Sequence, residues 1–84
     1  MLKARAHDLE PVVFIGGKGL TDEVVKEVDR ALAAHELIKV RAPGLDRVAR
    51  ATAFESLCER TGAVAVQSIG KVFVLFRKKK DDQT

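Results

Sequence analysis

A short apolar run that ends in a glycine-rich turn constrains the fold of this chain more than any other segment. Residues 12–15 are Val-Val-Phe-Ile, a composition typical of a β-strand that is covered on both faces. Residues 16–19 (Gly-Gly-Lys-Gly) follow at once, and Thr21 then has the side chain of a helix N-cap. The segment therefore predicts a strand, a tight turn with Lys18 at its tip, and a helix that ends near His35.

The turn has the features of a loop that contacts a phosphate backbone. Glycine has no Cβ, so its backbone can adopt positive φ and approach a ligand closely. The helix N-terminus behind the turn offers free N–H groups, although Asp22 and Glu23 partly neutralise it. The turn fits neither a Rossmann fingerprint, whose third glycine is absent, nor a Walker motif, in which the lysine follows the last glycine. A plain strand-to-helix connection is the alternative, but three glycines in four positions exceed what such a turn needs.

The other segments predict an α/β domain. Residues 37–42 alternate apolar side chains with Lys39 and Arg41, which indicates a strand with one basic face. Residues 46–60 predict a second helix that stops at Gly62. The remaining predicted elements are one or two helical turns at residues 2–8 and strands at residues 63–69 and 71–77, joined at Gly70. The predicted order α-β-α-β-α-β-β gives a compact α/β fold with a four-stranded mixed sheet, one domain over residues 1–80 and a charged tail at 81–84.

Basic residues are concentrated on the predicted strands and their loops. The 84-residue chain has a net charge of +3, which alone does not indicate a nucleic acid ligand. Residues 37–45 and 67–80 contain no acid, and their basic residues are Lys39, Arg41, Lys71, Arg77, Lys78, Lys79 and Lys80. Such segregation creates a positive surface that attracts polyanions. For residues 77–80 alone, a solvated tail partly cancelled by Asp81 and Asp82 is an equal alternative.

The sequence shows no constellation of catalytic or metal-binding residues. His7 and His35 pair with no nucleophile at an interpretable spacing, and Cys58, the single cysteine, lies on an apolar face of the second predicted helix. A disulfide or cysteine-based zinc site within the chain is excluded, and no apolar run approaches the roughly 20 residues of a membrane span. We therefore expect a non-catalytic, cytoplasmic, monomeric protein with no cofactor, metal or small-molecule substrate.

The aromatic residues argue against the reading of individual bases. Phe14, Phe54, Phe73 and Phe76 all lie in apolar runs typical of a core, and the chain has no Tyr or Trp. Stacking platforms for single-stranded RNA need exposed aromatic side chains. We therefore expect contacts with backbone and shape, which favour structured RNA.

Short stretches over nearly the whole chain match one family pattern. They are Ala6–Val13, Ile15–Thr21, His35–Val40, Thr61–Ala63, Gln67–Lys71 and Val74–Arg77. In these stretches the chain resembles the CRM domain (chloroplast RNA splicing and ribosome maturation), and most of all the stand-alone bacterial proteins of the YhbY type. Phe76 stands where the family commonly has tyrosine, and the leader before Ala6 is shorter than usual.

The resemblance implies a fold like that of the C-terminal domain of translation initiation factor 3 and a Gly-x-x-Gly loop that contacts RNA. It also implies a role in ribosome assembly, because the bacterial members are associated with precursors of the large ribosomal subunit. The residues expected to contact structured rRNA are Gly16, Gly17, Lys18, Gly19, Lys39, Arg41, Lys71, Arg77, Lys78, Lys79 and Lys80. The alternatives are a protein-interaction module of the assembling ribosome, docking through a sheet edge or residues 72–76, and a DNA-binding domain.

Overall fold

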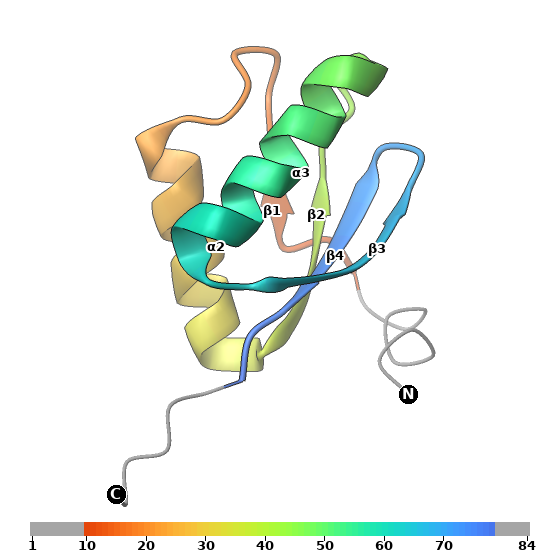
Figure 1. Ribbon diagram of the computed structural model, residues 1–84. Helices are drawn as coiled ribbons and strands as arrows, with labels where there is room; N and C mark the ends of the chain where they lie inside the picture. Colours follow the sequence, from red (N-terminus) through yellow and green to blue (C-terminus); the bar gives the residue numbers. More distant parts are fainter. Residues whose placement is uncertain (1–9, 79–84) are drawn as a thin grey trace, which may run out of the picture.

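The computed structural model describes residues 10–78, which form a two-layer α/β domain (Figure 1). In chain order the elements are β1 (Val13–Phe14), α2 (Asp22–His35), β2 (Leu37–Arg41), α3 (Arg47–Thr61), β3 (Val64–Ile69) and β4 (Val72–Phe76). The predicted fold class is confirmed, with two helices and a four-stranded mixed sheet among these residues. The helix expected at residues 2–8, Lys79, Lys80 and the tail at 81–84 lie outside the described residues.

The sheet has the strand order β1-β2-β4-β3. Strand β1 runs parallel to β2, and α2 is the connection between them, whereas β4 is antiparallel to both β2 and β3. Both helices lie on the same face of the sheet (Figure 1). No helix in the described part of the chain has the length and apolar character to span a membrane.

The core fills the space between the helices and one face of the sheet. The buried residues of the strands alternate along the chain, and they include Val13, Ile15, Ile38, Val40, Ala42, Phe73 and Leu75. Helices α2 and α3 contribute Val28, Leu32, Ala53 and Leu57 to the same cluster. Phe54 of α3 stacks on Phe73 of β4, with ring centroids 4.6 Å apart and planes 14° from parallel. Two of the phenylalanines thus serve the core, as the sequence predicts.

Side-chain caps define where the helices begin. The Thr21 hydroxyl accepts a hydrogen bond from the Val24 N–H at 3.2 Å, and Asp46 accepts one from the Ala49 N–H at 2.8 Å. Each cap satisfies a backbone donor that has no partner inside the helix. Gly62 ends α3 in the left-handed region, with φ of 74°, and its N–H donates to the Cys58 carbonyl. The predicted cap at Thr21 and the predicted stop at Gly62 are confirmed, and Asp46, predicted as the first residue of the second helix, is its cap.

Strand β1 differs from its sequence-based interpretation. Residues 12–15 were expected to be covered on both faces, but Val12 is 50% exposed and Phe14 is 57% exposed. Val13 and Ile15 are buried because side chains alternate along a strand and because α2 and α3, the helices of residues 10–78, cover the face to which these two side chains point. The expectation that Phe14 belongs to the core was therefore wrong.

Arg77 joins the end of β4 to both helices. Its guanidinium donates to the Asp29 carboxylate at 2.5 Å and to the Asp29 carbonyl at 3.0 Å, both on α2. The same side chain donates to the carbonyl of Thr61, the last residue of α3, at 2.7 Å. The side chain of Arg77 is only 24% exposed. Arg77 is thus a structural link between three elements.

Replacing Arg77 with glutamine should lower the free energy of unfolding by about 1–2 kcal/mol, because a charged donor to three oxygens is lost. Urea denaturation measures this difference directly. The matched control is Lys78→Gln, which removes the same charge from an exposed neighbouring residue and should change the free energy by less than about 0.5 kcal/mol. Equal effects of the two substitutions would refute the structural role of Arg77.

Candidate nucleic-acid interface

The Gly-x-x-Gly loop, residues 16–19, projects at one end of the sheet between β1 and α2 (Figure 1). The Gly19 N–H donates to the Gly16 carbonyl at 3.0 Å, which closes the turn. Gly19 has φ of 81°, a conformation that side chains with a Cβ rarely adopt. Residues 16–18 are exposed, so the backbone and the Lys18 side chain are accessible to a ligand.

A second turn supports the loop from the side of β2. A Cβ added at Gly44 would lie 3.2 Å from the Gly17 nitrogen and 3.3 Å from its Cα. The two turns therefore approach more closely than a larger residue at position 44 would permit. The loop is also tied to the sheet where it begins, because the Ile15 N–H donates to the Arg41 carbonyl at 2.8 Å. These contacts connect the position of the loop directly to β2.

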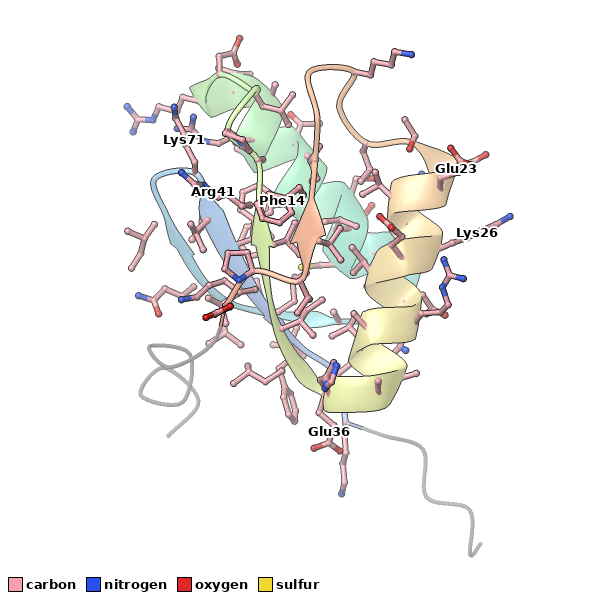
Figure 2. All side chains as sticks on the ribbon, turned by 180° about the vertical axis from the view of Figure 1, so that it is seen from behind. Phe14, Glu23, Lys26, Glu36, Arg41 and Lys71 are labelled. Carbon is pink, nitrogen blue, oxygen red and sulfur yellow. The ribbon has the colours of Figure 1, made fainter. Side chains whose placement is uncertain are left out.

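Two of the predicted basic residues lie at the same end of the sheet as the loop. Arg41 is the last residue of β2 and pairs with Phe14, two positions before Gly16. Lys71 lies in the β3–β4 turn, where its carbonyl accepts a hydrogen bond from the Ala42 N–H at 2.8 Å. Figure 2 shows Arg41 and Lys71 close to each other, and both residues are exposed. Lys39 lies two residues further along the same face of β2 and is half-buried.

The basic residues near the end of β4 are separated from this group. The register pairs Phe76 with Leu37 at the start of β2. Arg41 pairs with Val72, so Arg77 and Lys78 follow at the opposite end of the sheet, about 17–20 Å away along the strand. Arg77 is already engaged by Asp29. The structure thus places Lys18, Arg41 and Lys71 at the same end of the sheet, and it places Arg77 and Lys78 at the other end.

The acids at the start of α2 are arranged in two different ways. The carboxylate of Asp22 pairs with Arg60 of α3 at 2.8 Å. This hydrogen bond, with the charge of Arg60, lowers the pKa of the Asp22 carboxyl below its usual value. Glu23 is exposed (Figure 2). Arg60 therefore compensates one of the two negative charges that reduce the positive potential at the N-terminus of α2. The sequence alone did not suggest this role, because Arg60 is 38 residues from Asp22.

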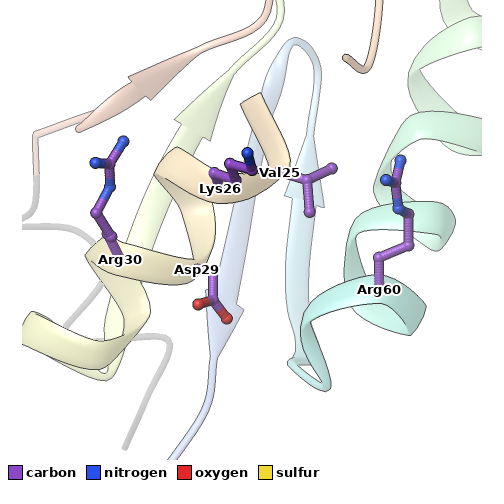
Figure 3. A pocket seen from close by; sticks show the side chains of 5 residues that line it. All are labelled: Val25, Lys26, Asp29, Arg30 and Arg60. Carbon is purple, nitrogen blue, oxygen red and sulfur yellow. The ribbon is translucent and has the colours of Figure 1, made fainter. Parts of the chain in front are cut away.

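Two surface hollows lie beside the helices. One of about 400 Å³ separates the end of the loop from α3 and is lined by Gly19, Leu20, Leu45, Ala49, Thr52, Ala53, Ser56 and Arg60. The other, of about 330 Å³, lies between α2 and α3 and is lined by Val25, Lys26, Asp29, Arg30 and Arg60 (Figure 3). Its single acid, Asp29, is paired with Arg77. Residues 10–78 contain no group of three or more His, Cys, Asp or Glu that could hold a metal ion.

The thiol of Cys58 fits the interpretation as a packing residue. Cys58 is half-buried and packs against the core cluster. Burial raises the pKa of the Cys58 thiol above its usual value. Since the thiolate is the reactive form, this environment makes the cysteine a poor nucleophile.

Comparison with known proteins identifies the family of this chain. The family model of the CRS1 / YhbY (CRM) domain matches residues 1–77. The chain therefore belongs to the CRM-domain family, as its sequence motifs suggest.

Relatives share most of their length with this chain. A protein of Haemophilus influenzae, named an RNA-binding protein, is 44% identical over 80 residues, which cover 95% of this chain and 81% of the relative. PA4753 of Pseudomonas aeruginosa, named a probable RNA-binding protein, is 41% identical over 90% of this chain and 73% of its own length. The solution structure of SAV1595 from Staphylococcus aureus, described as a candidate RNA-binding protein, has a TM-score of 0.83 and 32% identity, covering 98% of this chain and 85% of that one. These names describe binding proteins, not enzymes, in agreement with the expectation of a non-catalytic protein.

Replacing Gly44 with alanine should shift the Gly-x-x-Gly loop, because the new Cβ would press on the backbone of Gly17. Amide chemical shifts in a ¹H–¹⁵N spectrum should move at residues 16–19. The control is Gly17→Ala, because a Cβ added at Gly17 meets no atom within 4 Å. This substitution should leave the amide chemical shifts of the Pro43–Leu45 turn unchanged. Unchanged loop resonances in the Gly44→Ala variant would show that the two turns are not coupled.

Proposed function

We propose that this protein is a non-catalytic RNA-binding protein whose Gly-x-x-Gly loop follows the phosphate backbone of structured RNA. The observation that carries the proposal is the location of an exposed glycine loop, with Lys18, at the same end of the sheet as the exposed residues Arg41 and Lys71. Exposed backbone N–H groups and cations together suit a chain of phosphates. The names of the relatives support RNA as the ligand.

The proposed RNA is ribosomal RNA of the large-subunit precursor, bound during ribosome assembly in the cytoplasm by the monomeric protein. The resemblance to the stand-alone bacterial members of the family supports this assignment. Crosslinking in cells followed by sequencing of the bound RNA should recover precursor rRNA of the large subunit above its share of total RNA. Enrichment of messenger or transfer RNA instead would overturn the assignment while leaving RNA binding intact.

The structure argues against one of the two docking surfaces in the alternative of a protein-interaction module. Residues 72–76 were its candidate docking strand, but β4 lies between β2 and β3 and is not a sheet edge. The three central residues of this strand, Phe73, Val74 and Leu75, are at most 4% exposed. A partner could not pair with this strand without displacing a neighbour, so we favour RNA binding.

Charge reversal at the loop tests the proposal. Lys18→Glu should weaken binding to a structured RNA about tenfold, because it removes one phosphate contact and adds a repulsive charge. The dependence of log affinity on log salt concentration should become shallower, and the melting temperature should stay nearly constant, since Lys18 is exposed. Fluorescence anisotropy over a salt series measures both affinity and slope.

Lys78→Glu is the matched control, because it makes the same charge change on an exposed residue at the opposite end of the sheet. It should weaken binding by less than about threefold. Equal losses in the two variants would indicate a diffuse basic surface in place of the loop. Unaltered affinity in Lys18→Glu would contradict the loop assignment. Competition with duplex DNA of equal charge separates RNA binding from DNA binding.

A further inference from the structure

An exposed aromatic ring lies on the face of the sheet that the helices leave open. Phe14 is 57% exposed, while Val13 and Ile15 on either side are at most 4% exposed and point into the core. Figure 2 views this open face, with Phe14 on β1 near Arg41. An exposed phenylalanine contributes little to the core, so its ring is available to a ligand.

Strand pairing places Phe14 in a row with three other residues. Phe14 pairs with Arg41, Arg41 with Val72, and Val72 with Ile69. Paired residues on neighbouring strands project from the same face of a sheet. Ile69 is itself 61% exposed. We call these four residues the open-face row.

The charged side chains that flank the open-face row are basic. Lys39 and Lys71 flank the open-face row, and residues 11–21, 37–45 and 63–78 contain no acid. Flat apolar surface beside guanidinium and ammonium groups matches a ligand with aromatic faces and anionic linkages. A second copy of this chain is a poor occupant, because symmetric association would bring Arg41 and Lys71 of both copies together.

The open-face row is continuous with the Gly-x-x-Gly loop. Phe14 is two residues before Gly16, a separation of about 7 Å along an extended backbone. An RNA strand that follows the loop can therefore place a neighbouring nucleotide on the open face. Binding of bases to aromatic residues on an exposed sheet face is a general mode of single-strand recognition.

We propose that the open-face row binds one unpaired base of the RNA, which stacks on Phe14 while Arg41 and Lys71 neutralise the adjacent phosphates. The proposal rests on the proposed RNA-binding function and adds that the preferred RNA has an unpaired nucleotide next to its structured part. It revises the sequence-based expectation that no aromatic residue is available for stacking.

The first experiment compares two RNA probes of equal charge. One is a hairpin with a short single-stranded oligoadenosine extension, and the other carries an abasic extension with the same number of phosphates. Native protein should bind the oligoadenosine probe about tenfold more tightly. Phe14→Leu, which keeps an apolar side chain but has no ring, should remove this difference without changing the salt dependence. The melting temperature of the variant verifies that the fold is intact.

The second experiment uses the absence of tryptophan from the chain. Phe14→Trp introduces a single fluorophore at the proposed stacking position. The oligoadenosine probe should quench its fluorescence and the abasic probe should not, and the variant should retain the preference for unpaired bases. This variant decides the question even if Phe14→Leu proves unstable, because tryptophan retains the aromatic surface.

The two probes distinguish the absence of a stacking site from the absence of RNA binding. If native protein binds both probes equally with a strong salt dependence, the loop proposal stands and the stacking site is wrong. Unquenched Phe14→Trp fluorescence in a saturated complex has the same meaning. If neither probe binds, both proposals fail. A fluorescence change that depends on protein concentration alone would assign the open face to self-association and overturn the stacking site.

Discussion

Burial of one face of the sheet beneath α2 and α3 is the constraint on which the rest of the structure depends. Apolar side chains on alternate strand positions meet the two helices in a single cluster. On the opposite face, Leu37 and Val74 form a second, smaller buried group beside Val66 and Phe76. Several strand residues that point away from α2 and α3, among them Phe14, Arg41 and Ile69, are exposed. The exposure of Phe14 and Arg41 follows from this asymmetry.

The hydrogen bonds of Arg77 and the residues of the candidate interface lie at opposite ends of the sheet. At one end, Arg77 holds the end of β4 against both helices through Asp29 and Thr61. At the other end, the turn at Gly44 lies so near the glycine loop that a Cβ added there would press on the backbone of Gly17. Substitutions in the glycine turn can therefore alter the ligand surface with little effect on the core. The anchoring at the opposite end keeps the helices in place independently of any ligand.

The sequence predicts features that depend on near neighbours and misses those that depend on distant ones. The alternation of residues 37–42, the cap at Thr21 and the glycine stop at position 62 are local patterns, and the structure confirms them. Four consecutive apolar residues at 12–15 carry no alternation, so they cannot show that one side of β1 is open. The sequence does not predict the hydrogen bond between Arg77 and Asp29, because 48 residues separate them. The separation of Arg77 and Lys78 from the loop follows from strand register, which composition does not reveal.

The irregularity in β3 has a consequence for how copies of this protein behave beside one another. Strand β3 forms one edge of the sheet, and the register with β4 shifts between Ala65 and Gln67. Such a bulge twists an edge and interrupts its row of free backbone donors and acceptors. With Val64 and Ile69 both 61% exposed, a regular edge here would be a template for further strands. The shifted register thus interrupts this edge next to its exposed apolar side chains, which makes it a poorer template for pairing with a second copy.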